Sequence, residues 1–108
     1  MHTIPVALDR LHTPLCAAAP EPKHDPATGK ARIDYQGNPL WTIATVVHLA
    51  GHRKPSVIDI SIAYKPEGIA VGTPLRIIDL DAVPWALHGH VGVSFKAAQI
   101  LPCDSPDR

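Results

Sequence analysis

Apolar and mixed positions alternate with a period of two in the segments that lack proline and glycine. Within residues 56–65, the even-numbered positions from 58 to 64 hold three isoleucines and a tyrosine, whereas the odd-numbered positions are mixed in character. Residues 40–50 are dense in β-branched side chains, which favour a pleated surface. Because a period of two places alternate side chains on opposite faces of a strand, both segments are predicted to be strands.

Prolines and glycines divide the rest of the chain into pieces that are too short for helices. The sequence has 12 prolines and 7 glycines, and the longest segment free of both is residues 40–50. Proline lacks an N–H and clashes with the preceding turn, so an average helix of about 11–12 residues would hardly fit anywhere. Three further strands are predicted at residues 75–80, 82–87 and 91–101. Pro84 marks the second of these as an edge strand or a bulge.

The N-terminal third has a different composition. Residues 16–30 are rich in proline and alanine with little to bury, so we expect a long proline-rich loop there. Residues 4–11 could add a strand to the sheet edge. The predicted organisation is an N-terminal arm over residues 1–30, a β-barrel domain over 31–102 and a flexible polar tail over 103–108.

The predicted fold is all-β, a small antiparallel barrel that is OB-like and carries a proline-rich N-terminal arm. Short connections usually join antiparallel neighbours, and the OB-fold is the best-known barrel of this size. A six-stranded small barrel and a sandwich of two short sheets remain as alternatives.

Length and charge narrow the class of protein further. The chain has 108 residues, 45% of them apolar, which fits one small domain. Its formal net charge of zero argues against a basic nucleic-acid coat and against a polybasic membrane binder. No apolar stretch approaches the roughly 18 residues of a spanning helix, and the first residues do not resemble a signal peptide. We therefore expect a cytoplasmic protein without membrane contact. Cys16 and Cys103 are expected to be free thiols, with a disulfide joining the two ends as the alternative.

The sequence lacks the motifs of common catalytic sites. No Gly-x-Ser-x-Gly elbow, phosphate-binding loop or dinucleotide fingerprint is present, so a non-enzymatic protein without a cofactor is expected. His88 and His90 flank a glycine and could present two imidazoles, but a zinc site needs three or four ligands. We therefore interpret both residues as exposed turn histidines that bind no metal.

Basic residues suggest a nucleic-acid surface. In an OB-fold the loops between strands 1–2 and 4–5 flank the binding face, and here they correspond to residues 51–55 and 88–90. Between Lys30 and Pro102 the chain has seven basic and five acidic residues. Trp41, Tyr64 and Phe95 share the phase of the apolar faces and are expected in the core, which leaves Trp85 or Tyr35 to stack on a base. The predicted DNA-binding residues are Arg53, Lys54, Lys65, Arg76, Trp85, His88, His90 and Lys96.

Several short segments resemble one family. They are residues 22–30 leading to 37–41, residues 72–76, and Trp85 followed by residues 92–97. Their order resembles small proteins of actinomycete plasmids and integrative conjugative elements, among them replication, integration and excision activators of the Pra type, and is similar to OB-like accessory proteins of conjugative elements. The resemblance spans roughly residues 20–102 and implies a role in plasmid DNA replication or conjugation, with replication or transfer proteins as partners.

Two functions follow as hypotheses. The first is a non-enzymatic accessory protein of a plasmid or mobile element that binds single-stranded DNA weakly. The alternative is a protein-interaction or regulatory module without nucleic-acid contact, in which an edge strand pairs with itself or accepts a partner strand. The zero net charge fits the alternative better.

Overall fold

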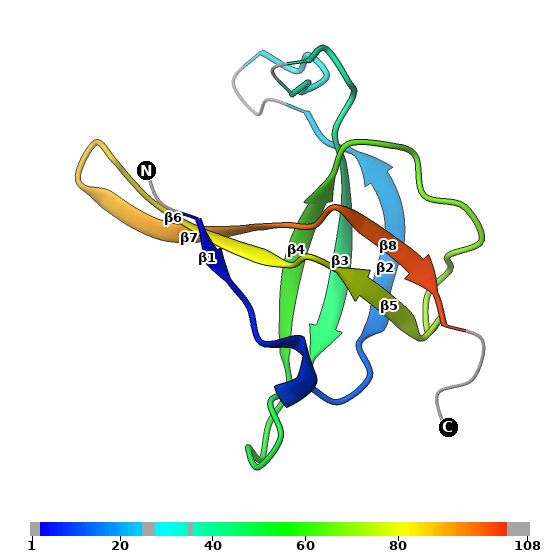
Figure 1. The fold of residues 1–108 in the computed structure, drawn as a ribbon. Helices are drawn as coiled ribbons and strands as arrows, with labels where there is room; N and C mark the ends of the chain where they lie inside the picture. Colours follow the sequence, from blue (N-terminus) through cyan, green and yellow to red (C-terminus); the bar gives the residue numbers. More distant parts are fainter. Residues whose placement is uncertain (1–2, 25–27, 35, 104–108) are drawn as a thin grey trace.

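The structure is a computed structural model that describes residues 3–24, 28–34 and 36–103 (Figure 1). Within these residues the chain is all-β apart from one helical turn, which confirms the all-β part of the predicted fold. The turn η1 is Leu8–Arg10. The strands are β1 (Ile4–Pro5), β2 (Leu15–Pro22), β3 (Trp41–Val47), β4 (Ser56–Ile62), β5 (Leu75–Ile78), β6 (Asp81–Leu87), β7 (His90–Lys96) and β8 (Gln99–Pro102).

The strands form an open mixed sheet and a smaller two-stranded sheet. The large sheet has the order β1-β6-β7-β4-β3-β2, and β5 pairs with β8. The pairing between β4 and β7 is parallel and covers only the pairs Ile60–Phe95 and Ser61–Lys96, while all other pairings are antiparallel. The predicted small antiparallel, OB-like barrel is therefore not formed, because the large sheet is mixed and β1 and β2 are its separate edges.

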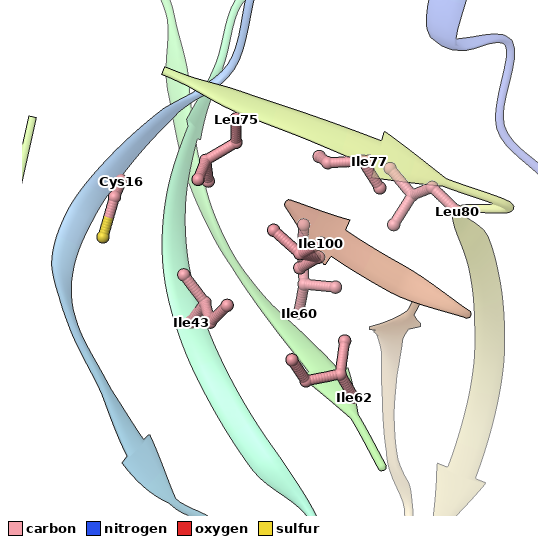
Figure 2. Close-up of a cluster of buried hydrophobic side chains, with 8 residues drawn as sticks. All are labelled: Cys16, Ile43, Ile60, Ile62, Leu75, Ile77, Leu80 and Ile100. Carbon is pink, nitrogen blue, oxygen red and sulfur yellow. The ribbon is translucent and has the colours of Figure 1, made fainter. Parts of the chain in front are cut away.

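The core lies between the inner face of β2, β3 and β4 and the β5–β8 ribbon (Figure 2). Ile60 and Ile62 are buried, as the alternation in residues 56–65 predicts, and their neighbour Ile43 on β3 is fully buried. Strand pairing brings Ile43 opposite Ile60, so both point to the same side of the sheet. The buried cluster consists of Cys16, Ile43, Ile60, Ile62, Leu75, Ile77, Leu80 and Ile100.

Three aromatic side chains lie at the edge of this core. Trp41, Tyr64 and Phe95 are half-buried and pack against the buried cluster, which confirms their predicted role. The Tyr64 hydroxyl donates a hydrogen bond to the Ile100 carbonyl oxygen (3.1 Å) and accepts one from the Ile100 N–H (2.9 Å). Tyr64 therefore ties the end of β4 to β8.

The predicted proline-rich loop of residues 16–30 is wrong for its first part. β2 covers Leu15–Pro22 and pairs with β3, and Cys16 is buried in the core. Proline is tolerated there because β2 is an edge strand, and its register shifts between Cys16 and Ala18 and again between Ala18 and Glu21. The edge strand expected within residues 4–11 exists as the two residues of β1.

The single strand predicted for residues 91–101 is two strands. β7 leaves the large sheet after Lys96, and β8 joins β5 instead. The switch is made by two consecutive backbone N–H groups: Ala97 donates to the Ser61 carbonyl and Ala98 donates to the Ile78 carbonyl, both at 3.0 Å. One continuous run of sequence therefore joins the two sheets.

Two other expectations concern the thiols and the membrane. Cys16 is a free thiol, as predicted, so the alternative of a disulfide between Cys16 and Cys103 is not formed. In the described ranges there is no helix with the length and hydrophobicity needed to cross a membrane.

Candidate functional site

The hairpin of β6 and β7 extends beyond the rest of the sheet, as the yellow and orange ribbon in Figure 1 shows. On one side, β1 pairs with β6 only at Asp81 and Ala82, and on the other, β4 pairs with β7 only at Phe95 and Lys96. Residues 83–94 therefore form a projecting hairpin whose two outer edges have no strand partner within the described chain. The projecting hairpin contains no Asp, Glu, Lys or Arg.

A two-residue turn fixes the register of the projecting hairpin. His88 and Gly89 have φ angles of 50° and 79°, and Leu87 lies opposite His90. Positive φ at both central residues is the geometry of a type I′ turn, whose twist matches that of the flanking strands. The pairing continues without a register shift to Asp81 and Lys96.

Both faces of the projecting hairpin are apolar. Residues that lie directly opposite each other share a face, so Val83, Trp85 and Leu87 lie on one face together with His90, Gly92 and Ser94. Pro84, Ala86, Val91 and Val93 occupy the other face. The exposed fractions are 80% for Val91, 62% for Leu87, 54% for Val93 and 38% for Trp85.

The Trp85 ring lies over Gly92 on the opposite strand. A Cβ atom placed on Gly92 would be 2.7 Å from Trp85 Cε2 and 3.0 Å from Cη2, which is closer than carbon atoms normally approach. Glycine at position 92 therefore leaves room for the indole against the backbone of β7, as strand glycines do for aromatic neighbours. The ring keeps part of its surface exposed while its position is fixed.

A groove of about 750 Å³ lies between the projecting hairpin and the β2–β4 side of the sheet. The two walls separate because β4 and β7 are paired only where they meet, at residues 60–61 and 95–96. Its polar lining combines cations, carboxylates and hydroxyl groups. The lining residues are Glu21, Pro22, Lys23, His24, Thr42, Val57, Ile58, Asp59, Ser61, Trp85, Val93, Ser94 and Phe95.

Lys23 is the best-defined polar group of the groove. Its Nζ donates a hydrogen bond to the Ser61 hydroxyl at 2.8 Å. Burial of the ammonium lowers the pKa of Lys23, repulsion by Arg32 lowers it further, and attraction by Asp59 raises it. With Glu21 and Asp59 on the same lining, the groove holds as many carboxylates as it holds Lys and His side chains.

The predicted DNA-binding residues do not form one surface. Arg53 and Lys54 lie in the β3–β4 connection, whereas His88 and His90 lie at the tip of the hairpin, and Figure 1 shows these two loops at separate ends of the molecule. The expectation that the two loops flank one face is therefore wrong. Of the other predicted residues, His90 and Lys96 share a hairpin face with Trp85, because they pair with Leu87 and Asp81.

The remaining predicted cations have other neighbours. Lys65 places its Nζ 5.8 Å from the centre of the Trp41 ring, and Arg76 is exposed on β5 in the small sheet. Tyr35 lies outside the described residues. Lys23 was not predicted, because it follows the prolines that were interpreted as a loop. The absence of charge from residue 82 to 95 is the signal that could have identified the projecting hairpin.

No cluster of three or more His, Cys, Asp or Glu side chains that could hold a metal ion occurs among the described residues. The sequence matches no protein-family model, and comparisons with curated proteins and with solved structures gave no significant match.

Proposed function

We propose that this chain is a non-enzymatic protein-interaction module and that the projecting hairpin is its binding surface. The observation that supports this function is the combination of two apolar faces, two open edges and no charged residue in residues 83–94. An exposed apolar surface of this kind is typical of protein interaction sites.

The open edges strengthen the argument. Exposed edge strands present unpaired N–H and C=O groups, and monomeric proteins commonly protect them with lysine, bulges or covering segments. In the projecting hairpin β7 has neither a charged side chain nor a bulge. A protein partner that covers the hairpin would remove the exposed valines from water and satisfy these backbone groups.

Single-stranded DNA is the second candidate ligand, and Trp85 is the observation that favours it. A fixed, partly exposed indole can stack on a base, and such stacking contributes about 1–3 kcal/mol per base. A phosphate backbone, however, requires clustered cations, and the adjacent groove carries Glu21 and Asp59. The charges therefore favour a protein partner over a polyanion.

The resemblance to proteins of plasmids and conjugative elements supports a setting for the module. It would act there in the cytoplasm as an accessory factor beside the replication or transfer proteins of such an element, whichever protein covers the hairpin.

Site-specific photocrosslinking tests the proposed function. Benzoylphenylalanine is placed at Leu87 or Val91 on the hairpin, and at the equally exposed Val71 as a matched control (67% exposed). We expect protein adducts from positions 87 and 91 in cells of the source organism and few from position 71. Equal adducts from all three positions would contradict the proposal. Fluorescence anisotropy with a labelled oligonucleotide at low salt completes the test, because salt-sensitive binding that Trp85→Ala abolishes would favour DNA instead.

A further inference from the structure

We infer that the protein bound by the projecting hairpin is a second copy of the same chain, joined through antiparallel pairing of the two β7 edges. This inference rests on the proposed function, because it names the partner of the same surface. Three observations lead to it: the direction of the free backbone groups on each edge, the position of Pro84, and the absence of Asp, Glu, Lys and Arg from residues 90–94 of β7.

The outer edge of β6 is a poor pairing edge. The Val6 N–H donates to the Leu80 carbonyl at 2.9 Å, so the backbone groups that point outward from this strand belong to even-numbered residues. Backbone groups alternate in direction along a strand, which makes Ala82, Pro84 and Ala86 the outward residues. Ala82 is already paired with Ile4 of β1, and Pro84 has no N–H. An incoming strand would find a missing donor at the centre of this edge.

The outer edge of β7 is complete. The Ala97 N–H donates to the Ser61 carbonyl of β4, so the outward residues of this strand are odd-numbered. Phe95 follows this pattern, because it pairs with Ile60. By the same alternation, Val91 and Val93 direct their N–H and C=O groups into the opening beside the groove. Neither residue pairs with β4 in the described structure.

The chemistry of β7 favours a strand like itself. A partner strand on this edge lies beside Val91 and Val93 on one face and beside Gly92 and Trp85 on the other, with no charge to match. A charged partner strand would lose hydration there without gaining an ion pair. Within the described chain, residues 90–94 of β7 are themselves a segment with a free edge and no Asp, Glu, Lys or Arg, so two copies provide matching surfaces.

A two-fold axis at Gly92 gives a self-complementary register. Val91 of each copy then lies opposite Val93 of the other, and these outward residues can form hydrogen-bonded pairs. Gly92 faces Gly92 of the second copy, and His90 faces Ser94. Isologous pairing of this kind closes after two copies, and two-fold dimers are the commonest soluble oligomers.

The same register brings the two Trp85 rings together. Each indole covers the Gly92 of its own chain, and the two glycines are neighbours on adjoining strands, which lie about 4.8 Å apart. The rings would therefore cover each other at the axis. Dimer formation should move Trp85 from a partly exposed to a buried environment, which gives a spectroscopic signature.

Light scattering coupled to size exclusion tests the dimer with the full chain. We expect a mass of twice the 11.6 kDa of one chain at high concentration and dissociation on dilution. Val93→Lys places a charge on the paired edge and should shift the protein to a monomer, whereas Val71→Lys, the matched control on an exposed valine, should leave the dimer intact. A wild-type protein that stays monomeric to millimolar concentration, or a Val93→Lys protein that stays dimeric, would overturn the inference.

A second measurement does not depend on the folding of the lysine variant. In a Trp41→Phe protein, Trp85 is the remaining tryptophan, and its emission should shift to shorter wavelength as concentration rises. An emission that does not change with concentration would count against the dimer. A monomeric protein whose residue 91 still crosslinks to other proteins would overturn this inference alone, while a monomer without adducts would overturn the proposed function as well.

Discussion

Substitution of Gly92 by alanine tests the packing of Trp85 directly. The new Cβ would lie 2.7 Å from Trp85 Cε2 and 3.0 Å from Cη2, while carbon atoms in contact prefer about 3.5–4.0 Å. The indole must therefore move by about 1 Å or rotate away from the strand. The φ angle of Gly92 is not in the left-handed region, so the substitution adds no backbone strain and isolates the steric effect.

The expected magnitude is the balance of two effects. Overpacking of this kind costs about 1–3 kcal/mol. Alanine gains about 0.5–1 kcal/mol over glycine within a strand, because the unfolded chain has less conformational freedom to lose. We expect the projecting hairpin to lose about 1–2 kcal/mol of stability, which corresponds to amide exchange about 5–30 times faster in β6 and β7.

Amide hydrogen exchange measured by NMR detects this loss of local stability in the hairpin. Global unfolding would not detect it, because the hairpin projects from the core. The control is Gly92→Ala in a Trp85→Ala background, where the clash is absent and alanine should stabilise the hairpin by about 0.5–1 kcal/mol. All variants are compared in the same oligomeric state. Unchanged exchange in the single Gly92→Ala variant, together with unchanged Trp85 emission, would refute the packing of the indole over residue 92.

Four further substitutions or reactions probe the rest of the fold. Tyr64→Phe removes both hydrogen bonds to Ile100, so the free energy of unfolding in urea should fall by about 1–3 kcal/mol, and equal stability would contradict the link between β4 and β8. His88→Asn should slow amide exchange in the hairpin, because asparagine tolerates positive φ better than histidine does, and faster exchange would contradict the type I′ turn. Burial raises the pKa of the Cys16 thiol, so iodoacetamide should alkylate Cys16 only after unfolding, as mass spectrometry would show. Burial lowers the pKa of Lys23 below its ordinary value of 10.5, so the charged ammonium destabilises the folded state below that lowered pKa. As the pH rises from there toward 10.5, the free energy of unfolding in urea should rise more steeply in the wild-type protein than in Lys23→Met.

The strands that the sequence predicts well are those whose pattern is local. The alternation in residues 56–65 locates β4, and proline and glycine delimit β3, β5 and β6 to within a few residues. β2 was missed because its prolines lie on an edge strand, where the sheet rather than the local sequence decides whether a missing N–H is tolerated. The division between β7 and β8 was missed because Ala97 and Ala98 are not residues that end strands. Tertiary hydrogen bonds to Ser61 and Ile78 create that division.

The candidate site shows the same limit. Trp85, predicted to stack on a base, is partly exposed, but the cations expected around it are distributed by long-range topology, which places Arg53 and Arg76 on other parts of the molecule. An OB-like arrangement would have placed the relevant loops together, and the open sheet does not. Which residues meet at a site therefore depends on strand order, and no local pattern encodes the short parallel contact between β4 and β7.

The composition of the projecting hairpin nevertheless has a consistent physical explanation. Pro84 removes a donor from the outer edge of β6, whereas Gly92 lies on β7 and leaves the opposite edge intact. If selection only kept the protein monomeric, a lysine among residues 90–94 would protect the open edge of β7 at little cost. The lysine of β7 is instead Lys96, at the end of the strand that β4 already covers. One edge is therefore blocked and the other left open. Such asymmetry is expected of a hairpin that pairs through β7.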